Sequence, residues 1–290
     1  MPPVLGLIAG SRAYDLLTSG AFGTTDPEPV ATPYGPSSPL WCGALWGHEV
    51  VLISRHGRRG YEIAAPFVNY RANLYALKDH GASRVLAWSG PGAINPGLAV
   101  GQYAIPRDVL DETRGREGTF FTGGGLGFIR QWPVFCPQLA DFALTAAAET
   151  GRAVQDDTVY VCTQGPRLET PAEIRKFATQ GADLVGMTLA PEVFLAKELE
   201  MCYAAICYVA NYAEGVVRRE FRPGELFEGM LSAEERQAAD EAVRALPDLF
   251  RRVLELAASQ PIACRCGQTM ERYKRRGDIG DDWREWVRVP

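Results

Sequence analysis

Several short apolar runs in this chain end directly before residues that can bind an anion. The run at 4–9 ends before Ser11, and the run at 49–54 ends before Arg55 and His56. A hydroxyl, a guanidinium and an imidazole beside glycine-containing turns are suited to a tetrahedral oxyanion. Two later runs end in the same way, before Ser89, Gly90 and Thr188. Each residue alone is more often a cap, a turn former or a surface group, so only the combination predicts an anion site.

The chain lacks the fingerprints of other cofactor sites. It contains neither the GxxxxGK[ST] phosphate loop nor the GxGxxG dinucleotide motif. Its seven cysteines show no CxxC pair and no neighbouring histidine, so their spacing predicts no zinc site. Cys264 and Cys266 are closely spaced, and we expect two free thiols there rather than a redox pair. The sequence therefore predicts no metal and no organic cofactor.

Strands alternate with helices along the chain, and these elements must position the candidate residues. Capping boxes at Thr170–Glu173 and Ser232–Glu235 mark two helix starts, and Pro247 should kink or split the second helix. Residues 115–127 are glycine-rich and are expected to form a mobile loop. The alternation predicts an α/β fold, a single domain with a twisted mixed sheet flanked by helices. The expected strands are 4–9, 49–54, 84–89, 158–162, 183–186 and 202–211, and the expected helices are 69–80, 139–149, 170–181, 190–201 and one from 232.

Composition bounds the class of protein. With 290 residues, 47% of them apolar, the chain can bury a sizeable core. We expect a domain at 1–260 and a tail at 261–290 that packs on the domain, packs on a neighbouring subunit or stays loose. The net charge is −5, and the basic run 273–276 is expected to be a solvated tail, which gives no case for nucleic-acid binding. No run approaches the length of a membrane span and no leader is recognisable, so we expect a cytoplasmic protein.

Longer motifs in the chain resemble those of one family. Residues 163–174, TQGPRLETPAEI, are similar to the signature segment of the purine nucleoside and methylthioadenosine phosphorylases. The similarity extends from about residue 6 to residue 215 in the same order, with a pattern nearest to the methylthioinosine phosphorylase branch. Further matching segments are RHGR at 55–58, VNYRAN at 68–73, FCP at 135–137, VGMT at 185–188 followed by Pro191 and Glu192, and VAN at 209–211.

The resemblance implies a reaction and a set of roles. Members of this family break an N-glycosidic bond by attack of phosphate on the anomeric carbon, so inorganic phosphate is a co-substrate and no cofactor is needed. Met187 would lie against the ribose, and Leu168, Glu169 and Asn211 would line the base pocket. The resemblance also implies a homotrimer or a hexamer. The residues implied to hold phosphate are Ser11, Arg55, His56, Ser89, Gly90 and Thr188.

The base pocket gives the most specific inference. The carboxylate of Glu169 can accept from N1–H of a 6-oxopurine, and Asn211 can donate to O6 or N7. Adenine-specific members of the family have aspartate in place of this asparagine. The pair therefore favours hypoxanthine or guanine over adenine. Taken in isolation, Glu169 would be a helix-start carboxylate and Asn211 a turn former.

Four positions depart from the family pattern, on the phosphate and 5′ sides of the site. Arg12 replaces a glycine and would either tighten phosphate binding or fill the pocket. Gly60 and Phe128 replace histidines, and Trp88 lies in a segment usually rich in Thr or Asn-Ala. A phenylalanine at 128 would suit an apolar 5′ group such as methylthio. These departures leave three further functions open: a methylthioadenosine phosphorylase, a nucleoside hydrolase, and a purine-binding protein with reduced or lost turnover.

Overall fold

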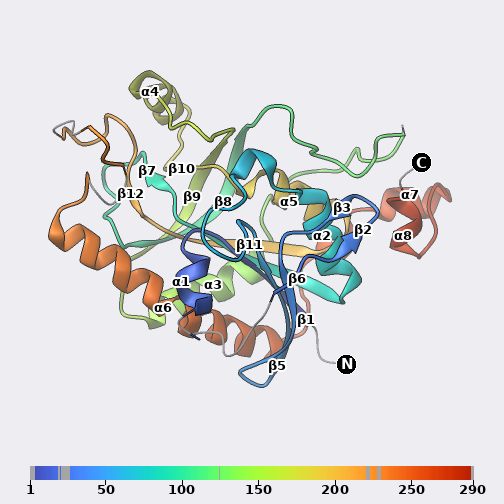
Figure 1. Cartoon of the computed structure of the whole chain (residues 1–290). Coiled ribbons are helices and arrows are strands. Elements are labelled where there is room, and N and C mark those ends of the chain that lie inside the picture. The colour runs from blue at the N-terminus through green and yellow to red at the C-terminus, as the bar shows by residue number, and fades with distance from the viewer. Residues whose placement is uncertain are drawn as a thin grey trace.

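A large mixed sheet forms the centre of the molecule (Figure 1). The computed structural model describes residues 4–18, 20, 27–123, 125–219, 223–226 and 230–288. The strands of this sheet are β1 (Val4–Ala9), β4 (Leu40–Leu45), β5 (His48–Ser54), β6 (Ala82–Ser89), β7 (Gly92–Ala93), β8 (Tyr103–Glu112), β9 (Val154–Thr163), β10 (Leu184–Gly186), β11 (Cys202–Tyr208) and β12 (Asn211–Tyr212). They lie in the order β12-β7-β10-β9-β8-β11-β6-β1-β5-β4, and a separate ribbon pairs β2 (Ala31–Thr32) with β3 (Gly35–Pro36).

Helices cover both faces of this sheet, as predicted. On one face, α3 (Pro137–Glu149) and α6 (Ala233–Ser259) pack together and share a core with Leu5 and Leu7 of β1. On the other, α2 (Tyr70–Asp79) and α5 (Leu189–Glu198) share a core with Ile8. Side chains of a strand alternate between faces, which explains why neighbours in β1 enter different cores. Two shorter helices, α1 (Ala13–Thr18) and α4 (Pro171–Thr179), follow β1 and precede β10.

Local signals in the sequence account for the helix ends. Both predicted capping boxes form, at Thr170 and at Ser232. Of the two effects predicted for Pro247, the split does not occur, since α6 runs unbroken from 233 to 259, and the kink stays a prediction. Its apolar face is buried along its whole length, and the Tyr103 hydroxyl donates to the Ala242 carbonyl at 2.7 Å, one turn before the proline. Tertiary packing therefore outweighs the helix-breaking effect of proline here.

The strand β8 has no counterpart in the sequence prediction. It pairs with β9 over most of its length but contains Pro106, a residue that normally argues against a paired strand. The register between the two strands shifts on both sides of Pro106. A bulge at this point accommodates the missing N–H, and so a long strand survives around a proline.

The C-terminal segment packs on the domain. It contains a 3-10 helix, η3 (Cys266–Gln268), and two short helices, α7 (Glu271–Arg276) and α8 (Trp283–Trp286). Met270, Tyr273 and Trp286 are buried in the same core as α2 and α5. The expectation of a solvated basic tail is wrong for two members of the run 273–276, since Tyr273 is buried and Lys274 pairs with Glu200 at 2.6 Å. No helix among the described residues is long and apolar enough to cross a bilayer.

Candidate active site

Two hydroxyls from distant parts of the chain meet where β6 and β10 end. Ser89 Oγ lies 3.5 Å from Thr188 Oγ1 and 3.2 Å from the hydroxyl of Tyr160, and all three residues are buried. One group of parallel strands, β8, β9 and β10, runs antiparallel to the other group, β11, β6, β1 and β5. The ends of β6 and β10 therefore do not meet simply because parallel strands end at the same edge of a sheet. The contact arises because the chain passes through Gly90 into β7, which lies antiparallel beside β10.

Arg55 lies inside the protein rather than on a pocket wall. Its Nε and Nη2 donate to the two carboxylate oxygens of Glu192, at 2.5 and 2.9 Å, and its Nη1 donates to the Trp88 carbonyl at 3.3 Å. Both members of this pair are 0% exposed. The Tyr203 hydroxyl also donates to Glu192, at 2.6 Å. Arg55 therefore joins the end of β5 to α5 and to the end of β6, and this ion pair was not foreseen from the sequence.

The turn after β1 is held from two sides. The indole N–H of Trp88 donates to the Ser11 carbonyl at 3.0 Å. Arg12 has φ +62, a conformation that suits the glycine usual at this position, and its guanidinium pairs with Asp15 at 2.9 Å and with Asp240 of α6 at 2.5 Å. A Cβ at Gly10 would collide with the Trp88 carbonyl oxygen, so the close approach of β1 and β6 requires glycine there.

A pocket of about 160 Å³ lies between this turn and the end of β5. Arg12 lines it without filling it, together with His56 and Gly60. Whole drug-sized ligands occupy cavities of about 300–1,000 Å³, so this volume suits an anion rather than a nucleoside. The pocket thus combines two departures from the family pattern, Arg12 and Gly60, with one predicted phosphate residue, His56.

His56 is held as a neutral imidazole. Burial and the positive charge of Arg55 lower the pKa of His56 to about 4. Its Nδ1 lies 2.9 Å from the carbonyl oxygen of Ile63, which can only accept, so Nδ1 carries the proton and Nε2 is left as an acceptor. A neutral ring with this tautomer can accept a hydrogen bond from the hydroxyl of a hydrogen phosphate.

Of the predicted base residues, Asn211 lies on β12 and Glu169 lies in the segment between β9 and α4. Glu169 accepts a hydrogen bond from Thr163 at the end of β9, at 2.5 Å, and Thr163 also donates to the Gly186 carbonyl at 3.3 Å. Asn211 pairs in register with Gly92 of β7, which lies beside β10. The order β12-β7-β10-β9 therefore places Asn211 and the anchor of Glu169 on either side of β10, which leads into Met187. Leu168 and Glu169 are both partly buried.

A sequence model described as the phosphorylase superfamily matches residues 5–255 of this chain. The chain belongs to this superfamily. Three curated relatives differ in their named substrates. A 6-oxopurine nucleoside phosphorylase of Pyrococcus furiosus is 34% identical over 91% of this chain and 96% of its own length. A probable S-methyl-5′-thioinosine phosphorylase of Methanothermobacter thermautotrophicus is 38% identical over 78% of each chain. An S-methyl-5′-thioadenosine phosphorylase of Mycolicibacterium smegmatis is 42% identical over 73% of this chain and 78% of its own length.

A solved structure supports the fold. A methylthioadenosine phosphorylase from an Antarctic soil metagenomic library superposes with a TM-score of 0.82 over 100% of both chains, at 24% identity. The predicted α/β fold with a large mixed sheet flanked by helices is confirmed. The predicted membership of the nucleoside phosphorylase family is confirmed as well.

Arg116 connects the two halves of the candidate site in this phosphorylase superfamily member. Its guanidinium donates to the Met187 carbonyl at 2.7 Å and to the Thr163 carbonyl at 3.1 Å. It also bonds the hydroxyl of Tyr70 at 3.0 Å, over whose ring it lies. Arg116 falls in the segment expected to be a mobile loop, and nothing in its glycine-rich surroundings indicates this clamp. The first part of 115–127 is therefore anchored to the site, and the mobility expected for the segment stays a prediction. Residue 124 lies outside the described residues.

The next part of the same loop is held by Glu198. This buried carboxylate accepts from Thr119 Oγ1 at 2.6 Å and from the Phe120 N–H at 2.7 Å. Further along, Phe128 is 78% exposed, and its N–H bonds the Tyr273 hydroxyl at 2.9 Å. Phe128 therefore does not line an enclosed cavity of its own chain, and its predicted position beside the 5′ end of a nucleoside stays a prediction.

The buried Glu198 makes stability depend on pH. Burial raises the pKa of Glu198 to about 7, partly opposed by its two hydrogen bonds, from an ordinary value of 4.5. Between these two pH values the folded protein keeps a proton that the unfolded chain releases, so the free energy of unfolding falls as pH rises. We expect Glu198→Gln to remove this dependence, which amounts to roughly 3 kcal/mol at most.

Urea unfolding of both proteins from pH 4.5 to pH 8 measures this effect. Other groups titrate in both proteins, including His56, whose pKa is lowered to about 4, and cancel in the difference. A difference between wild type and Glu198→Gln that stays constant with pH would contradict the assignment.

Proposed function

We propose that the protein is a cytoplasmic phosphorylase of 6-oxopurine nucleosides that works in purine salvage. Phosphate attacks the anomeric carbon of inosine, guanosine or 5′-methylthioinosine, and the products are the free base and a pentose 1-phosphate. The observation that carries this proposal is the meeting of Ser89 and Thr188, which lie 99 residues apart in sequence, beside the turn at Gly90. Buried hydroxyls beside such a turn are suited to a tetrahedral anion below a sugar.

Phosphate is held, in this proposal, by the ends of β1, β5, β6 and β10. The neutral His56 accepts a hydrogen bond from the P–OH group of a hydrogen phosphate. The negative oxygens of the phosphate then face the hydroxyls of Ser89 and Thr188. Arg55 lies behind this site and acts on phosphate through the backbone that it positions, because its charge is balanced by Glu192 and its Nη1 donates to the Trp88 carbonyl. Phosphate is the co-substrate, and the reaction needs no metal or organic cofactor. The full phosphate set is Ser11, Arg55, His56, Ser89, Gly90 and Thr188.

The purine lies, in this proposal, between Glu169 and Asn211. The bond from Thr163 engages one carboxylate oxygen of Glu169 and leaves the other for N1–H of a 6-oxopurine. Asn211 donates to O6 or N7, where negative charge develops as the glycosidic bond breaks. Met187 and Leu168 contact the ribose and the base. Adenine has no N1–H to donate to Glu169, so the carboxylate would face the lone pair of N1, which disfavours adenine.

One observation favours a second candidate, a purine-binding protein with reduced turnover. Arg55 directs Nε and Nη2 at Glu192 rather than at the pocket, and Arg12 is engaged by two carboxylates. Both arginines are thus less available to phosphate than a free guanidinium would be. Two more candidate reactions are the phosphorolysis of methylthioadenosine and the hydrolysis of a nucleoside by water.

Base release from a panel of nucleosides distinguishes these functions. The panel consists of inosine, guanosine, adenosine, 5′-methylthioinosine and 5′-methylthioadenosine, each with and without phosphate. We expect phosphate-dependent release of hypoxanthine or guanine, with kcat/KM for the adenine nucleosides lower by about 100-fold or more. Faster release of adenine would reject the roles of Glu169 and Asn211. Release without phosphate would indicate a hydrolase, and purine binding without any release would indicate a binding protein.

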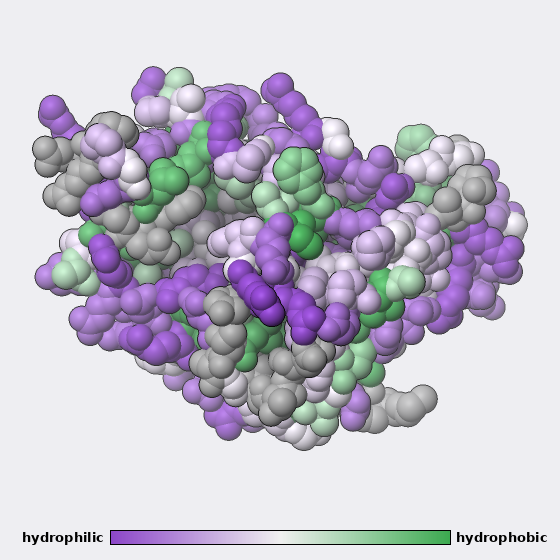
Figure 2. Space-filling view, in the orientation of Figure 1, coloured by the Kyte–Doolittle hydropathy of each residue, from purple (hydrophilic) through white to green (hydrophobic). Residues whose placement is uncertain are grey.

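We also expect a homotrimer or a hexamer. Large apolar side chains remain exposed on the single chain, among them Phe67, Phe128 and Trp132. On the face drawn in Figure 2, hydrophobic residues form separate green patches among hydrophilic ones. Exposed aromatic side chains of this kind support burial against neighbouring subunits.

A further inference from the structure

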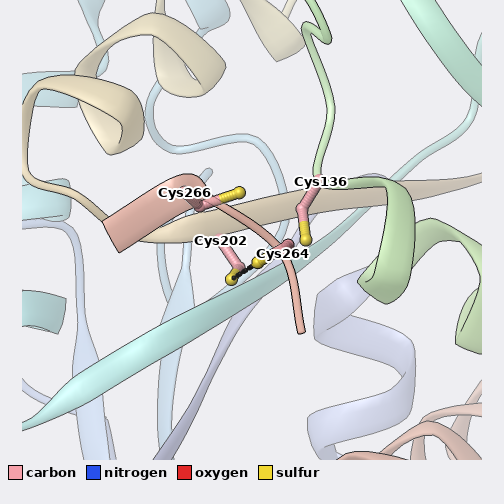
Figure 3. A group of neighbouring side chains, drawn as sticks. All are labelled: Cys136, Cys202, Cys264 and Cys266. Carbon is pink, nitrogen blue, oxygen red and sulfur yellow. Dashed lines mark hydrogen bonds between the residues drawn. The ribbon is translucent and has the colours of Figure 1, made fainter. Parts of the chain in front are cut away.

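Four cysteines from three parts of the chain converge at one place, away from the candidate active site. Cys136 is the N-cap of α3, Cys202 begins β11, and Cys264 and Cys266 lie in the segment that follows α6. Figure 3 shows the four side chains extending toward one another from these elements. All four sulfur atoms lie within 4.8 Å of one another.

This arrangement fits a tetrahedral metal ion. Zinc binds thiolates at about 2.3 Å, which places the sulfurs of a ZnS₄ group about 3.8 Å apart. The sulfurs of Cys202 and Cys264 are 3.3 Å apart, and the whole group stays within 4.8 Å. Small shifts of the side chains therefore suffice to reach metal-ligand geometry. Four sulfur donors without a carboxylate or an imidazole are typical of a structural zinc site.

The surroundings stabilise thiolates. The Leu139 N–H at the start of α3 donates to the Cys136 sulfur at 3.5 Å, and helix N-termini favour a negative sulfur.

We propose that Cys136, Cys202, Cys264 and Cys266 bind one zinc ion as four thiolates. The four thiols lose their protons on binding, four Zn–S bonds form, and no electron is transferred. With all four positions occupied by protein, the ion has no open site for chemistry and is structural.

The centre fastens the C-terminal segment to the domain. Two of its ligands, Cys264 and Cys266, belong to that segment, and the other two belong to α3 and β11. Directly after the ligands, Thr269 donates to the Lys197 carbonyl at 2.6 Å and the Met270 N–H donates to Glu200 at 3.0 Å. Zinc therefore fixes the starting point from which Met270 and the residues after it enter the core.

Metal analysis of the full-length protein tests the site. We expect about one zinc ion per chain after dialysis against metal-free buffer, and close to none in the double variant Cys264→Ser/Cys266→Ser. The matched control is Cys42→Ser, which changes an exposed cysteine on β4 and should retain the ion. The melting temperature of the double variant should fall by roughly 5–10 °C relative to this control. Protein produced with cobalt in place of zinc should show thiolate-to-cobalt charge-transfer absorption with the d–d bands of a tetrahedral site.

The remaining outcomes overturn the proposal. Wild-type protein that contains no metal would exclude the zinc centre. This holds whether its mass shows disulfides, by the loss of two hydrogens for each one, or shows four free thiols. Iron in place of zinc rejects the assigned metal, and zinc retained by the double variant places the ion elsewhere. If the double variant does not fold, the metal content and the cobalt spectrum of the wild type still show whether the four cysteines bind a metal ion.

Discussion

Replacement of Glu192 by glutamine is expected to lower the free energy of unfolding by about 3–5 kcal/mol. Glutamine keeps the size of the side chain but removes the negative charge that faces Arg55. Since arginine stays protonated in proteins and this guanidinium is fully buried, a positive charge would remain in the interior without a counterion. Urea unfolding followed by far-ultraviolet circular dichroism measures the loss.

A matched control separates burial from pairing. Glu149→Gln breaks an ion pair of similar geometry, with contacts of 2.7 and 3.1 Å to Arg252, but the two side chains are 40% and 46% exposed. We expect a far smaller change there, because water screens the exposed pair. Equal losses in the two variants would contradict the view that Glu192 stabilises a desolvated charge.

A double replacement separates stability from activity. Arg55→Met together with Glu192→Leu removes both charges, and such exchanges often restore stability. We expect this variant to be more stable than Glu192→Gln and yet to lose phosphorolysis, because the guanidinium that holds the Trp88 carbonyl at the end of β6 is gone. A stable double variant with unchanged KM for phosphate would remove Arg55 from the phosphate set.

Replacement of Asn211 by aspartate is expected to change the preferred base. A carboxylate accepts from a 6-amino group and, when protonated, donates to N7, whereas it repels O6 of hypoxanthine. The ratio of kcat/KM for inosine to that for adenosine should fall by about 100-fold or more. Steady-state kinetics with both nucleosides at saturating phosphate measure this ratio. Asn211→Ala is the control and should slow both substrates without reversing their order, and an unchanged ratio in the aspartate variant would place the base elsewhere.

The elements with strong local signals could be predicted from sequence. The helices that begin at Thr170 and Ser232 carry complete capping boxes, and β1 is a buried run bounded by glycine. The strand β8 could not be predicted, because Pro106 argues against pairing and only the bulge opposite β9 accommodates it. The continuity of α6 past Pro247 also depends on tertiary packing that no local pattern contains.

The sequence indicates candidate residues for the site but not the contacts that connect them. The strand-end residues were identified by type and by order along the chain. The partner of Arg55 was not, because Glu192 lies 137 residues away and only the fold brings the two together. The cysteine cluster was missed for the same reason. Spacing rules detect ligands close in sequence, whereas Cys136 and Cys202 join Cys264 and Cys266 through the packing of α3, β11 and the C-terminal segment.

The turn after β1 has a consequence for the proposed anion site. Trp88 and Asp240 fix its backbone before any ligand arrives, so its conformational entropy is lost during folding and not during binding. A preorganised turn of this kind gives tighter and faster capture than one that must order itself around its ligand. A substitution of Asp240, in the first third of α6, would thereby act on the proposed anion site through Arg12.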